Sequence, residues 1–208
     1  MSARVCRLAR AISLALASLA LLLLGCCGQA IEETTVRDIP VDVAHSGIVR
    51  GDAREILGVA QQEVWKHLPG AYLNVFAYTG HCDALPNLQG KFNMQFVRVD
   101  RSFLRRRELT AFVSIDTSRG MMDIEYLDYT GLGLRANGLT FGPEEIGLAE
   151  MARIAYDYIS MSGLSDCDVT ITRTKQAWNV RCGAIENFVQ ECLFEIDPST
   201  GEISSADE

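Results

Sequence analysis

The chain shows the same order of hydrophobic patterns twice: a helical stripe followed by segments that alternate apolar and polar residues. In the first half, residues 51–68 predict a helix that Pro69 and Gly70 end. Its apolar stripe comprises Ile56, Leu57, Ala60, Val64 and Leu68. Four strands are predicted to follow, over 72–79, 92–97, 109–115 and 122–126.

The second half begins again with a predicted helix. Pro143 suits the first helical position, and Glu144 and Glu145 suit the positive end of the helix dipole. The stripe of this helix comprises Ile146, Ala149, Ala152, Tyr156 and Ile159, and Gly163 is placed to cap it. Three short strands are predicted around 169–171, 178–180 and 194–196.

Both halves also end in the same turn pattern, Ile-Asp-x-Ser-x-Gly, at 115–120 and 196–201. The Asp can accept hydrogen bonds from turn amides, and the Gly can adopt positive φ. The pattern predicts an α+β fold of two helix-plus-antiparallel-sheet units (α-β-β-β type) in tandem. The alternative is that one turn type arose twice by chance.

The helix, three antiparallel strands and closing Asp-x-x-Thr-Gly-x-Ile of residues 142–203 resemble the PepSY-type domain of secreted and membrane bacterial proteins. Residues 51–122 resemble it more loosely. The resemblance implies a helix packed on a curved antiparallel sheet and a binding or inhibitory role, sometimes towards peptidases. It brings no catalytic residues.

Residues 1–25 have the composition of a secretory signal peptide. Arg4, Arg7 and Arg10 precede an apolar run over 11–24. That run is shorter than the roughly 20 apolar residues of a membrane-spanning helix. The segment therefore predicts export.

The end of this segment, Leu23-Leu24-Gly25-Cys26, resembles the lipobox of bacterial lipoproteins. The resemblance implies cleavage before Cys26, acylation of that cysteine and a location at the cell envelope. Because Cys27 rather than Asp follows, the resemblance favours, for a proteobacterial host, an outer-membrane lipoprotein that faces the periplasm. Ordinary cleavage after Ala30 is the alternative.

Five segments follow from these patterns: a signal peptide (1–25), a lipidated flexible tether (26–48), a first α+β unit (49–130), a linker (131–141) and a second, PepSY-like unit (142–204). The 208 residues carry a net charge of −8. Removal of the signal peptide leaves 16 Lys and Arg against 27 Asp and Glu, a net charge of −11. That balance argues against a nucleic-acid partner.

Four cysteines remain for the folded part: Cys82, Cys167, Cys182 and Cys192. An exported chain meets oxidising conditions, so these four cysteines can form two disulfides, in any of three pairings. A hairpin centred at 174.5 would place Cys167 opposite Cys182, whereas one centred at Asn187 places Cys182 opposite Cys192. We favour Cys182–Cys192, which leaves Cys82 and Cys167 as the second pair.

Positive charge concentrates around one strand connection, at Arg98, Arg101, Arg105, Arg106 and Arg107. We take Arg101, Arg105, Arg106 and Arg107 as candidates for contact with an acidic partner, an anionic polysaccharide or lipid headgroups. The alternative is a solvated loop.

Catalytic and metal-binding patterns are lacking in the sequence, which shows no Ser-His-Asp order, catalytic carboxylate pair or zinc motif. His81-Cys82-Asp83 is the one tight cluster of ligand-type residues, but metal ligands usually converge from separated positions. We expect no metal and no small-molecule cofactor.

The sequence therefore predicts a non-catalytic protein-binding lipoprotein, held to the membrane by its lipid. An inhibitor or immunity protein for an exported hydrolase or toxin is the first hypothesis. An envelope assembly or scaffolding lipoprotein is the second. An enzyme that uses unrecognised residues is the third.

Overall fold

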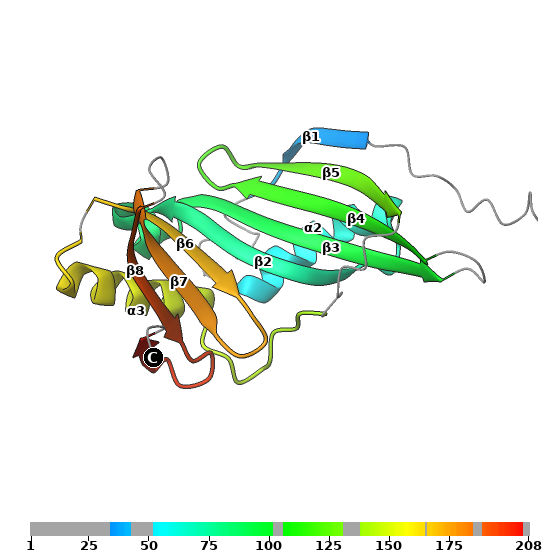
Figure 1. The fold of residues 1–208 in the computed structure, drawn as a ribbon. Coiled ribbons are helices and arrows are strands. Elements are labelled where there is room, and N and C mark those ends of the chain that lie inside the picture. The colour runs from blue at the N-terminus through cyan, green and yellow to red at the C-terminus, as the bar shows by residue number, and fades with distance from the viewer. Residues whose placement is uncertain are drawn as a thin grey trace, which may run out of the picture.

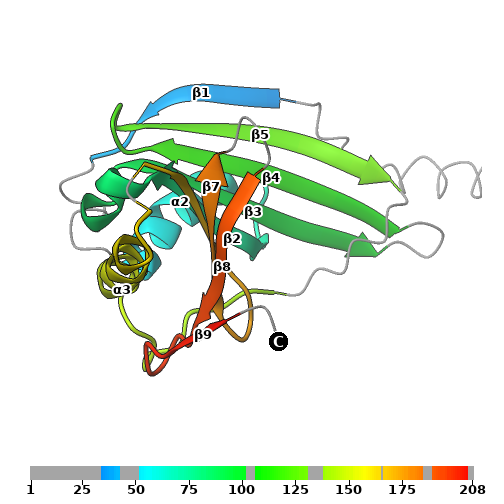
Figure 2. The ribbon, with the colours of Figure 1, turned by 60° about the vertical axis from the view of Figure 1, so that its left-hand side comes forward.

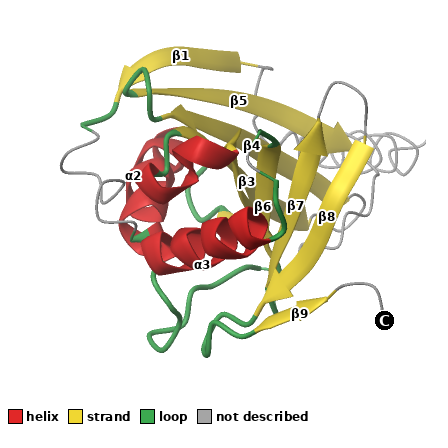
Figure 3. Ribbon diagram, turned by 90° about the vertical axis from the view of Figure 1, so that its left-hand side faces the viewer, coloured by secondary structure: helices red, strands yellow, loops and turns green. Residues whose placement is uncertain are grey.

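A computed structural model describes residues 34–42, 52–101, 106–130, 138–164, 166–184 and 189–205. The strands in this part of the chain form one antiparallel sheet in the order β1-β5-β4-β3-β2-β6-β7-β8-β9. Helices α2 and α3 lie on the same face of that sheet (Figures 1 and 3). No helix of the described residues lies on the other face of strands β2 to β5.

The first half follows the predicted order of elements. Helix α2 spans Ala53–His67, and the carboxylate of Asp52 caps it by accepting from the amide of Arg54 at 2.8 Å. The remaining elements are β2 (Tyr72–His81), the 3₁₀ helix η1 (Cys82–Asn87), β3 (Gly90–Arg101), β4 (Arg106–Asp116) and β5 (Met121–Thr130).

The second half contains α3 (Leu148–Met161), β6 (Asp168–Arg173), β7 (Trp178–Ala184), β8 (Val189–Ile196) and β9 (Ile203–Ser205). The predicted helix start at Pro143 is wrong, because α3 begins at Leu148. The backbone amide of Ile146 instead donates to the carbonyl of Pro198 at 2.7 Å. The side chain of Glu145 turns to Arg173, so it is not available to the helix end.

The predicted fold class, two tandem helix-plus-sheet units, is wrong, because both halves share one nine-stranded sheet. The strands β2 and β6 pair over six residues, from Phe76 opposite Arg173 to His81 opposite Asp168. Two separate units would leave these edge strands unpaired, with exposed N–H and C=O groups. Pairing them satisfies those groups, and we call the β2–β6 contact the seam.

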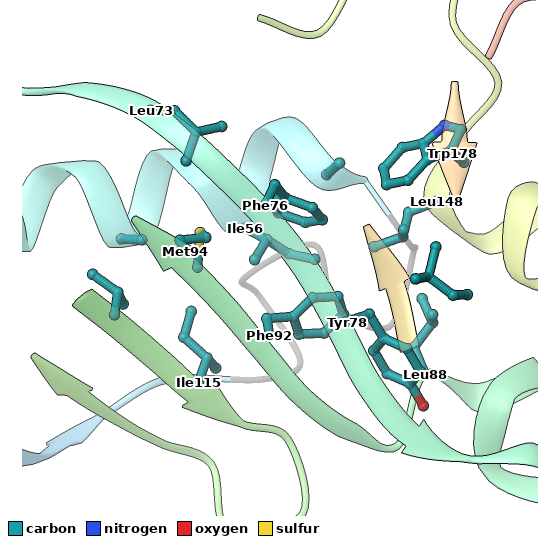
Figure 4. Packing of buried hydrophobic residues seen from close by; sticks show 14 of the residues in the cluster. Ile56, Leu73, Phe76, Tyr78, Leu88, Phe92, Met94, Ile115, Leu148 and Trp178 are labelled. Carbon is teal, nitrogen blue, oxygen red and sulfur yellow. The ribbon is translucent and has the colours of Figure 1, made fainter. Parts of the chain in front are cut away.

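A single hydrophobic core lies between the helices and the sheet and crosses the seam. It includes Ile56 of α2 and Leu148 of α3, both almost fully buried. Phe76 of β2 meets Trp178 of β7 nearly edge to face, with ring centroids 6.1 Å apart. Figure 4 shows Phe76 and Ile56 at β2, with Leu148 and Trp178 beside them near the orange strands.

The repeated turn behaves as the sequence predicted. Asp116 accepts from the amides of Ser118 and Arg119, at 3.0 and 3.2 Å. Asp197 accepts from the amides of Ser199 and Thr200, both at 2.8 Å. Hydrogen bonds to the charged carboxylate lower the pKa of both aspartates.

Strand β1 (Thr34–Pro40) lies within residues 26–48, where the sequence predicted a tether and no strand. It pairs with β5 at the edge of the sheet, as Figure 2 shows. Five of its seven residues are exposed, so no alternation of apolar and polar residues marks it. A shift of register between Val36 and Ile39 interrupts its pairing, and Asp38 there has a φ of 55°.

A buried ion pair fixes the segment that leads into α3. The guanidinium of Arg173 lies 2.9 Å from the Glu145 carboxylate, and the two side chains are 3% and 13% exposed. Arg173 also stacks over the ring of Trp178, 5.5 Å from its centroid. Glu145 accepts in addition from the amide of Gly142 at 2.8 Å.

We therefore expect Glu145→Ala to lower the free energy of unfolding by about 3 kcal/mol, because it leaves the charge of Arg173 buried without its partner. Urea titration followed by circular dichroism measures this. Glu150→Ala, which breaks an ion pair with the exposed Arg153, should leave the midpoint unchanged. Equal effects of the two substitutions would contradict the assignment.

Candidate binding site

The face of strands β2 to β5 that lies away from the described helices carries a hollow. Strand registers place Val75, Gln95, Phe112, Glu125 and Thr35 in one row across β2, β3, β4, β5 and β1. A second row holds Asn93, Ser114 and Asp123. A hollow of about 410 Å³ opens over these rows and is also bounded by Arg37. Figure 1 views this face, with α2 behind the strands.

An exposed aromatic ring lies at the centre of this hollow. Phe112 is 37% exposed and stands between Gln95 and Glu125 in its row. Large exposed apolar side chains with a polar rim are typical of interaction sites. The centre of the hollow can therefore bury an apolar side chain of a partner.

The rim of the hollow carries hydrogen-bonding and charged groups. The carboxylates of Asp123 and Glu125 lie on β5, and the guanidinium-bearing Arg37 lies on β1. Two side-chain amides supply further donors and acceptors, and Gln95 is held by a 2.9 Å hydrogen bond from Asn74. Asp123 also accepts from the backbone amide of Asp38 at 2.9 Å, which ties β1 to this face.

The arrangement suits the binding of a cationic and apolar group. Within the part of the chain that the structure describes, no His, Cys or Lys lines the hollow, and Ser114 lies directly opposite the carboxylate-bearing Asp123. The two carboxylates can pair with a cationic group, and the face of Phe112 can stack on one. A partner segment with basic and apolar side chains fits both features.

A second polar cluster lies at the end of the seam. His81 contacts Asp83 through Nδ1 at 2.7 Å and Asp166 through Nε2 at 3.1 Å. The hydrogen bond to Asp83, followed by the one to Asp166, raises the pKa of His81 above 6.5. His81 and Asp83 are close together along the chain, but only the fold brings Asp166 to them. Groups of three or more His, Cys, Asp or Glu able to hold a metal do not occur in the described ranges.

The cysteines confirm one predicted pairing. Cys182 and Cys192 are opposite each other in β7 and β8 and form a disulfide, with 5.0 Å between their Cα atoms. The alternative pairing of Cys167 with Cys182 is wrong, because Val169 and not Cys167 lies opposite Cys182. Cys82 and Cys167 are both buried thiols, and the amide of Cys82 donates to the carbonyl of Cys167 at 2.9 Å.

The arginine candidates lie at the far end of the β3–β4 hairpin, where Arg101 pairs with Arg106 in the ladder. The guanidinium of Arg107 binds the carboxylate of Asp128, at 2.8 Å from Nε. Arg98 binds Asp100 in the same way, at 3.0 Å. Arg105 lies outside the described residues. The guanidinium groups of Arg98 and Arg107 are therefore paired with aspartates of the chain itself.

The predicted signal peptide, the lipobox and Cys26 also lie outside the described residues. Neither helix within the described ranges has the length and apolar composition that a bilayer crossing requires. No family model, curated protein or solved structure matches the chain. The likeness to bacterial lipoproteins and to the PepSY-type domain therefore depends on the quoted motifs alone.

Sequence reasoning did not select Phe112, Asp123 or Glu125. One signal was available: Phe112 is out of phase with the apolar positions of its strand, Leu109, Ala111 and Val113. An aromatic residue on the polar face of an alternating strand indicates a second use for that face.

The His81 cluster generates a prediction about pH. We expect Asp83→Asn and Asp166→Asn each to lower the pKa of His81, measured by following its ring signals in an NMR titration. A pKa raised by folding stabilises the native state below about pH 6.5, and this stabilisation is lost as the pH rises through the folded-state value.

Asp157→Asn serves as the control for this titration, because Asp157 pairs with Arg153 on α3. It should leave the pKa of His81 where it is. A His81 pKa that is unmoved by both Asp83→Asn and Asp166→Asn would refute the described contacts.

Proposed function

We propose that the chain is an envelope-anchored lipoprotein that binds another protein and carries out no catalysis itself. The observation that carries the proposal is the Phe112-centred hollow on a sheet face that no described helix covers. Its acidic rim and the net charge of −11 expected after signal removal suit a partner with a basic surface.

Anchoring is supported by the lipobox-like Leu23-Leu24-Gly25-Cys26. Thr34 begins β1 only eight residues after Cys26. A fully extended chain covers at most about 3.6 Å per residue, so acylated Cys26 would keep Thr34 within roughly 29 Å of the membrane surface. The hollow, of which Thr35 is part, would then face partners close to the envelope.

The partner class that fits this position is an exported hydrolase or a delivered toxin, and the binding protein would act as its inhibitor or immunity protein. The acidic rim favours this hypothesis, because a basic partner would be steered to the hollow electrostatically. If a captured enzyme keeps its full activity, the chain acts as a scaffolding lipoprotein instead.

The anchor is tested by Cys26→Ser. We expect this substitution to abolish incorporation of labelled palmitate and to move the chain from the membrane fraction to the soluble fraction, because the thioether can no longer form. Cys27→Ser, one residue away, should change neither result. Unchanged fractionation of Cys26→Ser would instead support ordinary cleavage after Ala30.

The binding site is tested by Phe112→Ala. A buried aromatic anchor contributes about 2 kcal/mol or more to an interface, so the affinity for a captured partner should fall roughly 30-fold. Glu125→Lys should weaken binding of a basic partner and reduce its dependence on salt.

The matched control is Met161→Ala, since Met161 is an exposed apolar side chain on α3, 86% accessible and remote in sequence from the hollow. It should bind as the unaltered chain does. Equal binding by all three variants in surface plasmon resonance would place the interface elsewhere.

A further inference from the structure

The seam between β2 and β6 ends at two cysteines. His81 opposite Asp168 is the last pair of this ladder, and Cys82 and Cys167 are the next residue on each side. The amide of Cys82 donates to the carbonyl of Cys167 at 2.9 Å, so the antiparallel register continues for one more position. Cys82 and Cys167 therefore lie directly opposite each other.

Directly opposite residues of an antiparallel pair point to the same face of the sheet. Both cysteines are buried in the hydrophobic core, 1% and 4% exposed. Opposite positions have Cα atoms about 4.5 to 5.5 Å apart, within the range of roughly 4.4 to 6.8 Å that disulfides adopt. Cys182 and Cys192 occupy an equivalent opposite position in β7 and β8 and are bonded.

We propose that Cys82 and Cys167 form a second disulfide that locks the seam once the chain is exported. That the bond forms after export rests on the proposed envelope location. That it can form at all rests on the positions of the two cysteines at the end of the β2–β6 ladder. The bond joins η1, which follows β2, to the start of β6, and so fastens the first half of the sheet to the second.

The chemistry is a thiol–disulfide exchange. The two thiols lose two protons and two electrons and gain one S–S bond, through a mixed disulfide with the oxidant. The oxidant is a disulfide compound or a disulfide-carrying oxidase, which is reduced to two thiols. Access is needed only before the seam closes, because both sulfurs are buried in the folded chain.

Because it closes a longer loop, the Cys82–Cys167 bond should stabilise the fold more than the Cys182–Cys192 bond does. Cys82 and Cys167 are 85 residues apart, against a separation of 10 for Cys182 and Cys192. The longer loop removes more conformational freedom from the unfolded chain. The contacts of His81 with Asp166 and of Cys82 with Cys167 lie side by side, so the same junction is held by a polar bridge outside and a sulfur pair inside.

The test uses the chain from residue 26 to 208, which contains every described element, oxidised with glutathione disulfide and mapped by mass spectrometry without reductant. We expect a peptide pair linked through Cys82 and Cys167. Alkylation of both cysteines after denaturation in the oxidised sample would overturn the proposal, and so would a link from either one to Cys182 or Cys192.

Stability gives an independent readout. The double variant Cys82→Ala/Cys167→Ala should melt roughly 10 °C below the oxidised unaltered chain, and this gap should shrink after reduction of both. Cys182→Ala/Cys192→Ala, the matched control, should show a smaller gap of roughly 6 °C. A Cys82/Cys167 gap that is unaffected by reduction would reflect lost packing alone and would count against the bond.

Mapping of the chain recovered from cells separates this proposal from the envelope location. Suppose that all four cysteines are reduced in the chain from cells, but that both disulfides form when the purified chain is treated with glutathione disulfide. The envelope location would then be wrong, whereas the proposal that the seam can form the Cys82–Cys167 bond would stand.

Discussion

The pairing of β2 with β6 is the contact on which the rest of the architecture depends. Six residue pairs join the two halves of the chain, and every other pair of neighbouring strands lies within one half. Without the β2–β6 pairing, each half would be a separate sheet with an open edge and one helix. With it, Phe76 and Trp178 meet across the seam and both helices share a core.

The same pairing sets where binding can occur. Because both described helices lie on one face of the continuous sheet, no described helix covers the opposite face of β2 to β5 (Figure 3). Antiparallel sheets tolerate such a face when its residues are polar. Here the row is broken by Phe112, whose ring is half-exposed between Gln95 and Glu125. A helix on that side would cover the hollow.

Periodicity in the sequence predicted the two helices and seven of the strands, because each of those elements has one face in the core. Prediction from periodicity failed where a residue makes a contact that its place in the pattern does not indicate. Glu145 looks like a residue of a helix N-terminus, but it binds buried Arg173 instead, so α3 begins later. Edge strand β1 shows no alternation, since only two of its seven side chains are even partly buried. The hairpin centre at Asn187 gave the right disulfide because strand register follows from the turn.

The sequence by itself predicted the two helices, seven of the nine described strands, the two Asp-containing turns and the favoured Cys182–Cys192 disulfide, since these depend on residues within a short stretch of chain. The proposed export of the chain and acylation of Cys26 likewise depend on a linear motif. Only the tertiary structure decided that the two halves share one sheet and one core. It also brought Asp166 to His81, Cys167 to Cys82 and Glu125 to Phe112. These contacts join residues that are distant along the chain. Which strand edges pair depends on which of them can satisfy each other's backbone N–H and C=O groups. Local periodicity does not encode that partner.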